Sequence, residues 1–215
     1  AWAVDIVNAT RDDHIMTVED PIEFIHHHKR CVVNQREAGE DTLLSVTALK
    51  HVLRQDRDVI LVGEMRDPEA IATAITAAAI SHLVFGTLHT QNAPQAIDSI
   101  IDVFPAHQQQ QVRSRLAFSL LAVRTQQLVP RIDGMGRVAA CEVMIVTPVI
   151  RNLIRDARTH QVYSLRQAGA KFGMQTMDQS LVHLVGDGAI TMDLALEWSH
   201  NESDLTRMVS DASIF

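Results

Sequence analysis

The chain has 215 residues, is 47% hydrophobic and carries a formal net charge of -7 with only three lysines. It is long and apolar enough to bury a sizeable core, but its charge argues against a general nucleic-acid binder, because phosphate neutralisation needs clustered Lys and Arg. No apolar run is long enough to span a bilayer, and Asp5, Asp12 and Asp13 interrupt any signal-peptide pattern, so we expect a soluble, cytoplasmic protein.

Short apolar runs alternate with helical patterns through the first part of the chain. Runs with the β-branched composition of strands cover residues 14–18, 31–33, 59–62 and 83–88. Residues 42–55 carry apolar side chains at helical spacing, and the alanine-rich residues 69–80 follow Asp67 as an N-cap and Pro68 at the first helical position. This alternation predicts an α/β domain with a largely parallel, buried sheet.

A change of pattern follows residue 146. Residues 138–146 read as a fifth strand, and helical patterns alone follow it, over residues 149–157, 163–170, 178–185, 192–198 and 203–209. We therefore expect an α/β core over residues 1–146 and an all-helical subdomain over residues 147–215, packed on that core.

Polar side chains stand where three of the predicted strands end. Glu19 and Glu23 follow the first strand, Glu64 follows residues 59–62, and His89 follows residues 83–88. In a parallel sheet these ends share one edge, where α/β proteins bind ligands. Each cluster also has a simpler reading: Asp20–Pro21 as a turn, Glu64 as a chance acidic residue and His89 as a structural histidine. The repetition on three successive strands favours a site.

Four segments resemble those of one protein family. TVEDPIEF at residues 17–24 resembles the Asp box of secretion and pilus ATPases, and DVILVGEMRD at residues 58–67 resembles their Walker B segment. HLVFGTLHT at residues 82–90 resembles their His box, and VIRNLIRD at residues 149–156 is similar to a helical signature of the retraction branch. The chain thus resembles the C-terminal motor domain of type IV pilus retraction ATPases, which implies a RecA-like P-loop NTPase core.

The resemblance implies roles at the matching positions. Glu64 corresponds to the catalytic carboxylate that orients or deprotonates the attacking water. Glu19 and Glu23 correspond to residues that hold Mg²⁺ and water near the γ-phosphate. His89 corresponds to a residue that contacts or senses the nucleotide. The remaining nucleotide-binding candidates are Arg36, His82 and Arg66, with Arg36 also a candidate arginine finger.

Further expectations concern coupling and assembly. The residues implied to couple the motor to retraction are Arg151, Asn152 and Arg155, although an ordinary amphipathic helix with Ile150, Leu153 and Ile154 in the core explains the same pattern. The cofactors implied are ATP and Mg²⁺. The partners implied are a homo-hexameric ring and an inner-membrane pilus platform protein, with the motor peripheral at that membrane.

The sequence also departs from the family pattern. It contains no G-x-x-x-x-G-K-[ST] loop, and Ile80–Ser81 replaces a usual Thr-Gly pair before the His box. We expect triphosphate binding to be severely weakened and this chain alone not to be a competent ATPase, through truncation or degeneration. The alternatives are a related type II/IV secretion ATPase, or a non-catalytic interaction module that keeps the fold.

Overall fold

The computed structural model describes residues 1–37, 58–65, 67–167 and 169–212. Its contacts divide the chain into two compact units. The first unit contains Ala1–His89 and Ile100–Leu120, and the second contains Thr90–Ser99 and Leu121–Phe215. The predicted division after residue 146 stays a prediction.

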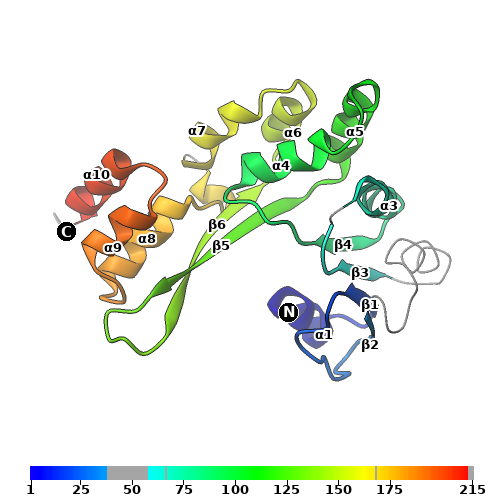
Figure 1. Cartoon of the computed structure of the whole chain (residues 1–215), viewed down its shortest axis with the longest axis horizontal. Coiled ribbons are helices and arrows are strands. Elements are labelled where there is room, and N and C mark those ends of the chain that lie inside the picture. The colour runs from blue at the N-terminus through cyan, green and yellow to red at the C-terminus, as the bar shows by residue number, and fades with distance from the viewer. Residues whose placement is uncertain (38–57, 66, 168, 213–215) are drawn as a thin grey trace. The chain divides into compact units, whose positions relative to one another are not determined.

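The first unit is built on a four-stranded sheet (Figure 1). Its strands are β1 (His14–Glu19), β2 (Val32–Glu37), β3 (Val59–Val62) and β4 (Leu83–Gly86), in the order β2-β1-β3-β4. All three pairings are parallel, which confirms the predicted parallel sheet. The unit's helices are α1 (Trp2–Thr10), α3 (Pro68–Ala79) and α5 (Ala106–Ser119). The predicted helix over residues 42–55 lies outside the described residues.

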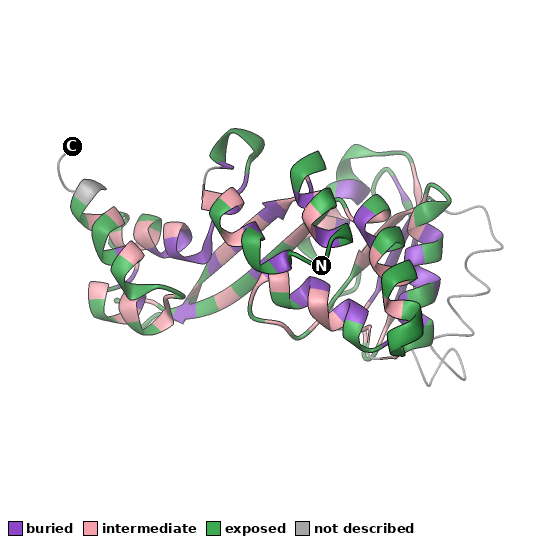
Figure 2. Cartoon of the chain, turned by 90° about the horizontal axis from the view of Figure 1, so that it is seen from above, coloured by how far each residue is buried: buried purple, intermediate pink, exposed green. Residues whose placement is uncertain are grey.

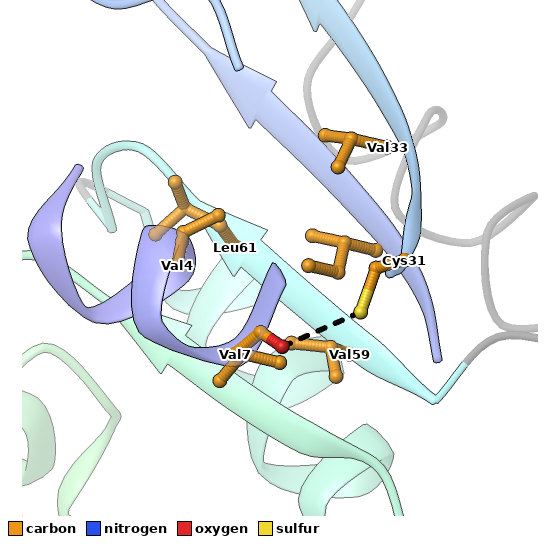
Figure 3. Packing of buried hydrophobic residues seen from close by; sticks show 7 residues of the cluster. Val4, Val7, Cys31, Val33, Val59 and Leu61 are labelled. Atoms are coloured by element: carbon orange, nitrogen blue, oxygen red, sulfur yellow. Dashed lines mark hydrogen bonds between the residues drawn. The ribbon is translucent and has the colours of Figure 1, made fainter. Parts of the chain in front are cut away.

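Both faces of this sheet are buried, which explains its nearly continuous apolar strands. Because successive side chains of a strand point to opposite faces, Ile15 and Met16 enter different cores. Helix α1 covers the Ile15 face with Val4 and Val7, and Figure 3 shows this packing around Val59 and Cys31, whose thiol lies 3.5 Å from the Val7 carbonyl oxygen. Helix α3 covers the opposite face, the one that carries Met16.

Local signals in the sequence set the bounds of α3. The Asp67 side chain accepts the N–H of Ala70 at 2.8 Å, so the predicted N-cap is confirmed. Pro68 occupies the first helical position, where its missing N–H costs nothing. After the helix, Ser81 has φ of 79°, in the left-handed region that favours glycine. The departure from the family's Thr-Gly pair therefore falls on a backbone conformation that suits glycine better than serine.

The second unit contains an antiparallel ribbon of β5 (Ala122–Pro130) and β6 (Arg137–Ile145). The expectation of a strand near residues 138–146 is confirmed, but the structure pairs it in a ribbon apart from the parallel sheet. Strand β5 was missed by the sequence patterns, because its centre is a polar run from Arg124 to Gln127. Cross-strand partners such as Thr125 and Glu142 define the register.

Helices follow the ribbon, as the sequence predicts. They are α6 (Pro148–Arg155), α7 (Val162–Gln167), α8 (Met177–Gly186), α9 (Met192–Trp198) and α10 (Glu202–Ala212), with 3-10 turns at Thr159–Gln161 and Ala170–Phe172. Helix α4 (Ala93–Asp102) begins in this unit and ends in the first.

One apolar core joins the last helices of the second unit to the ribbon. Val129 and Ala140 from the ribbon pack with Met177 and Leu181 from α8 and with Leu205 from α10. Figure 2 shows the resulting pattern, in which helices are buried on one side and exposed on the other. In the described part of the chain, no helix has the length and apolarity needed to cross a membrane.

Candidate active site at the carboxyl edge of the sheet

The three predicted polar clusters meet at one edge of the parallel sheet. Val18 pairs with Val62, and Val62 pairs with Gly86, so the chain leaves β1, β3 and β4 at adjacent positions. Hydrogen bonds continue this pairing beyond the strands: the Gly63 N–H donates to the Val18 carbonyl at 2.7 Å, and the Met65 N–H donates to the Thr87 carbonyl at 3.2 Å. The expected convergence of the strand ends is therefore present in the structure.

Gly63 allows the close approach of β3 to β1 at this edge. A Cβ atom at position 63 would lie 2.8 Å from the Cα of Glu19 and 3.0 Å from the Val18 carbonyl oxygen. Both neighbours are backbone atoms, so neither can move aside cheaply. The absence of a side chain at Gly63 thus sets the spacing between Glu19 and the segment that carries Glu64.

Glu64 and His89 lie in direct contact. The Oε1 atom of Glu64 is 3.1 Å from Nε2 of His89, and the two side chains are 19% and 85% exposed. A mostly shielded carboxylate beside an accessible imidazole can accept a proton from water or exchange one with the ring. Thr87, two residues before His89, donates its hydroxyl to the Gly63 carbonyl and ties the two strand ends together.

Glu19 is held in one orientation by two hydrogen bonds. Its Oε1 atom accepts the hydroxyl of buried Thr17 at 2.7 Å and the side-chain amide of Gln35 at 3.0 Å. Within the described part of the chain, its Oε2 atom takes part in no hydrogen bond or ion pair. A carboxylate fixed in this way presents one oxygen to a cation or to water.

The segment after β1 is tied to β2. The side chain of Gln35 donates to the Phe24 carbonyl and accepts the His26 N–H, while Glu37 accepts the Ile22 N–H at 2.8 Å. Glu23 lies on this segment and is exposed. Arg36, on β2, pairs in register with Val18, one residue before Glu19.

Not every predicted site residue reaches this edge. His82 precedes β4, at the amino end of the parallel strands, and its Nδ1 atom lies 3.2 Å from the Ala77 carbonyl oxygen. It therefore stands at the edge opposite Glu64 and His89 of its own chain. Arg66 lies outside the described residues.

The predicted coupling residues lie on α6 in the second unit. Ile150 and Ile154 are fully buried there, whereas Leu153, also predicted in the core, is only half-buried. The interpretation of α6 as an amphipathic helix is confirmed for the two isoleucines. Asn152 is exposed, and Arg155 lies 3.4 Å from Asp156 with its side chain 56% exposed. Their part in coupling stays a prediction.

Two residues of the site were missed by the sequence analysis. Thr17 and Gln35 orient Glu19, yet neither belongs to a residue type that signals catalysis. A signal was present for Thr17, a polar residue within an otherwise apolar strand. The sequence gives no such signal for Gln35, because Gln35 reaches Glu19 only through the pairing of β2 with β1.

The oxygen ligands at this edge fit Mg²⁺ in its usual mode of binding. Among the described residues, no group of three His, Cys, Asp or Glu side chains could hold a metal by itself. Mg²⁺ is commonly bound through one or two carboxylates together with waters and substrate phosphates. The preoriented carboxylate of Glu19 suits that role, and Glu23 follows it by four residues.

A parallel sheet covered on both faces makes this an α/β protein, and its carboxylates and imidazole lie at the carboxyl edge, where proteins of this class bind ligands. The chain belongs to the type II/IV secretion system protein family, whose model matches residues 2–196. This result agrees with the resemblance found in its motifs.

Individual relatives point to one branch of that family. The chain is 50% identical over 206 residues to the twitching motility protein of Neisseria gonorrhoeae, and 54% identical over 197 residues to the type IV pilus retraction ATPase PilT of Pseudomonas aeruginosa. These alignments cover 96% and 92% of this chain. The crystal structure of the pilus retraction motor PilT with bound ADP superimposes with a TM-score of 0.86 at 50% identity, over 95% of this chain and 58% of that one.

The chain spans about half the length of the curated relatives it matches. It covers 55% of the Neisseria protein and 57% of the Pseudomonas protein. The similarity therefore applies to the matched part of those proteins.

Proposed function

We propose that this chain is part of an ATP-hydrolysing motor that powers type IV pilus retraction. The observation that carries the proposal is the contact of Glu64 with His89 at the edge where Glu19 is also held. The similarity to retraction ATPases over most of the chain supports the same function.

Glu64 acts as the catalytic carboxylate in this proposal. Its position beside His89 and its limited exposure keep it oriented toward the edge, where it can align or deprotonate a water molecule for attack on a γ-phosphate. His89 senses the nucleotide in this proposal, because its accessible ring can donate a hydrogen bond to a phosphate oxygen at the same edge.

Glu19, with Glu23, holds Mg²⁺ and its waters near the phosphates. The bound cation neutralises charge that develops during phosphoryl transfer. The hydrogen bonds from Thr17 and Gln35 fix Glu19 before the nucleotide arrives, so no reorganisation of this carboxylate is needed during the reaction. Arg36 is proposed to stabilise phosphate charge, in its own subunit or across a boundary in a hexameric ring.

The test uses what we call the extended protein: residues 1–215 joined to the part of the Pseudomonas relative that precedes the matched segment. That part is expected to supply the phosphate-binding loop that the 215 residues lack. The extended protein, the 215-residue chain and an extended Glu64→Gln variant are compared in a steady-state ATPase assay. We expect turnover only in the extended protein, with a loss of about 10²- to 10⁴-fold in the Gln variant.

Circular dichroism and sedimentation show whether each protein is folded and assembled. If the extended protein is folded and hexameric but inert, the enzyme assignment fails and a non-catalytic interaction module replaces it. If the Gln variant retains full activity, Glu64 is not the catalytic carboxylate.

The retraction role has a separate test in cells. The extended protein is expressed in a Pseudomonas aeruginosa strain that lacks its own retraction ATPase, and twitching on agar is measured. Restored twitching supports retraction. Active ATPase without restored twitching points instead to a related secretion role.

A further inference from the structure

The connection from β1 to β2 carries Glu23 and has no regular secondary structure (Figure 1). We call residues 20–31 the Glu23 segment. They form neither helix nor strand, so side chains of neighbouring elements bind their backbone instead of a ladder partner. Side chains on β2 bind the first half of the segment, and α1 binds the second half.

Asn8, near the end of α1, binds the second half of the Glu23 segment at three points. Its side-chain amide donates to the His27 carbonyl oxygen at 2.8 Å, and its Oδ1 atom accepts the Lys29 N–H at 3.1 Å. Its backbone carbonyl accepts the Arg30 N–H at 2.9 Å. A carbonyl in the last turn of a helix has no donor within the helix, so this third bond serves α1 as well.

Burial makes these bonds important for Asn8. The residue is 0% exposed, and asparagine is a poor helix former, so neither contact with water nor helix propensity explains its presence on α1. A buried amide needs a partner for its donor and for its acceptor, and both partners lie on the Glu23 segment. Lys29 also pairs with Asp5 on α1, at 2.7 Å, but this exposed pair contributes less.

Gln35, on β2, joins the Glu23 segment to Glu19. Its Nε2 group donates to Oε1 of Glu19 at 3.0 Å and to the Phe24 carbonyl at 2.8 Å. Its Oε1 atom accepts the His26 N–H at 2.6 Å. One amide therefore binds the carboxylate on one side and the segment on the other. A displacement of residues 24–26 must move the Gln35 side chain or break its bonds, and either change alters the orientation of Glu19.

The contacts of Asn8 and Gln35 meet at two adjacent residues. Asn8 binds the carbonyl of His27, and Gln35 binds the N–H of His26, whose side chain is only 8% exposed. All of these residues belong to the first unit, together with Glu19 and the β1 strand that it ends. A continuous series of bonds thus leads from α1 to the candidate site.

We propose that Asn8 is a positioning residue of this site, which fixes Glu19 and Glu23 for Mg²⁺ by holding the Glu23 segment between α1 and Gln35. The functional part of this inference rests on the proposed ATPase activity. Groups that orient a metal ligand without touching the metal commonly change the affinity for the metal by about 10- to 100-fold. Loss of Asn8 should therefore change the Mg²⁺ requirement and not only stability.

Three variants test the series of bonds. Asn8→Ala removes both side-chain bonds to the Glu23 segment, and Gln35→Met breaks the series at its other end. Val4→Ala is the matched control, because Val4 is 1% exposed, lies one turn earlier on α1 and packs against Ile15 in the core. The control therefore weakens the packing of α1 without removing a bond to the segment. Urea unfolding checks that each variant is folded.

The first readout is NMR-detected amide hydrogen exchange in the 215-residue chain. In Asn8→Ala, exchange of the His26 amide is expected to be at least ~10-fold faster, although its own acceptor, Gln35, is still present. Val4→Ala should leave this rate as in the wild type. Unchanged exchange of His26 in Asn8→Ala would overturn the inference. If Asn8→Ala does not fold, Gln35→Met decides instead: the Lys29 amide should exchange faster with Asn8 intact, and an unchanged rate would overturn the inference.

The second readout is the Mg²⁺ dependence of ATP hydrolysis by the extended protein at a fixed ATP concentration. Asn8→Ala is expected to raise the Mg²⁺ concentration for half-maximal rate by ~10-fold, with kcat at saturating Mg²⁺ little changed. Val4→Ala should leave both values unchanged. An equal Mg²⁺ requirement in Asn8→Ala and Val4→Ala would contradict the proposal.

A double variant tests whether Asn8 acts through Gln35. Asn8→Ala with Gln35→Met should need no more Mg²⁺ than Gln35→Met alone, because both changes break the same series of bonds. Effects that multiply would show that Asn8 acts by another route and would contradict the proposal. An inert wild-type extended protein would count against the ATPase function, while the exchange comparison would still decide whether Asn8 holds the segment.

Discussion

Arg166 and Glu142 form an ion pair from which water is excluded, with side chains 2% and 1% exposed. The two charges come from segments 24 residues apart, which only the packing of α7 on β6 brings together. Such a pair makes the two residues depend on each other, because either charge left alone would be buried without compensation.

Loss of one partner should therefore cost more than loss of both. Arg166→Met alone is expected to destabilise the chain by about 3–5 kcal/mol, and Glu142→Met with Arg166→Met by clearly less. Urea unfolding followed by circular dichroism measures both differences. An Arg131→Gln control breaks an exposed pair with Asp133 and should have a small effect. A double variant as unstable as the single one would show that the cost lies in lost packing rather than in the unpaired charge.

His89→Gln is expected to lower activity without affecting stability. The ring is 85% exposed, so its contact with Glu64 contributes little to folding. The free energy of unfolding should therefore change by no more than about 0.5 kcal/mol. In the extended protein, kcat should fall by about 10²-fold, because the imidazole that we propose senses the phosphate is gone. Thermal unfolding tests the expected effect on stability, and a steady-state ATPase assay tests the expected effect on activity. Unchanged turnover would assign His89 no part in the reaction.

Gly63→Ala tests the close approach of β3 to β1. The added methyl group would lie 2.8 Å from the Cα of Glu19, so the strands must separate, at a cost of about 1–3 kcal/mol. Gly186→Ala is the matched control, since nothing lies within 4 Å of its Cβ position and it ends α8. The control should be neutral or slightly stabilising. Chemical unfolding of both variants compares their free energies of unfolding. Equal effects would show that Gly63 is not needed for the close approach of β3 to β1.

Ser81→Gly should stabilise the chain. Ser81 has φ of 79°, which strains a serine but not a glycine, and the relief is partly offset by the greater freedom of glycine in the unfolded chain. The net gain is expected to be up to about 1 kcal/mol. Ser114→Gly, within helix α5, should instead lose about 0.5–1 kcal/mol. The two midpoints of urea unfolding should therefore move in opposite directions.

The carboxyl group of Asp133, in the turn between β5 and β6, should titrate at unusually low pH. Hydrogen bonds from the Arg131 guanidinium and from the Met135 N–H lower the pKa of Asp133 from 3.8 to about 2. Because the folded-state pKa is lowered, the ionised carboxyl of Asp133 stabilises the fold above pH ~4. This contribution is lost as the pH falls from ~4 to ~2. It is small, because the pair is exposed. In Arg131→Gln the pKa should rise, but not fully to 3.8, since Met135 still donates. Carbon-detected NMR of the Asp133 carboxyl group follows both titrations.

The elements predicted with success are those whose signals are local. Continuous apolar runs identified β1, β3 and β4, and the cap at Asp67 marked the start of α3, because each of these signals acts within a few residues. Strand β5 escaped because the sequence from Arg124 to Gln127 is polar, and its existence depends on pairing with β6.

The candidate site shows the same division. The sequence by itself determined that Glu19, Glu64 and His89 follow parallel strands, since strand ends and residue types are written along the chain. Only the tertiary structure decided that His89 contacts Glu64, that Gln35 orients Glu19, and that Glu142 accepts the N–H of Ala93. These contacts join residues far apart in sequence, and their geometry depends on strand order and on which charges become buried together, which no local pattern encodes.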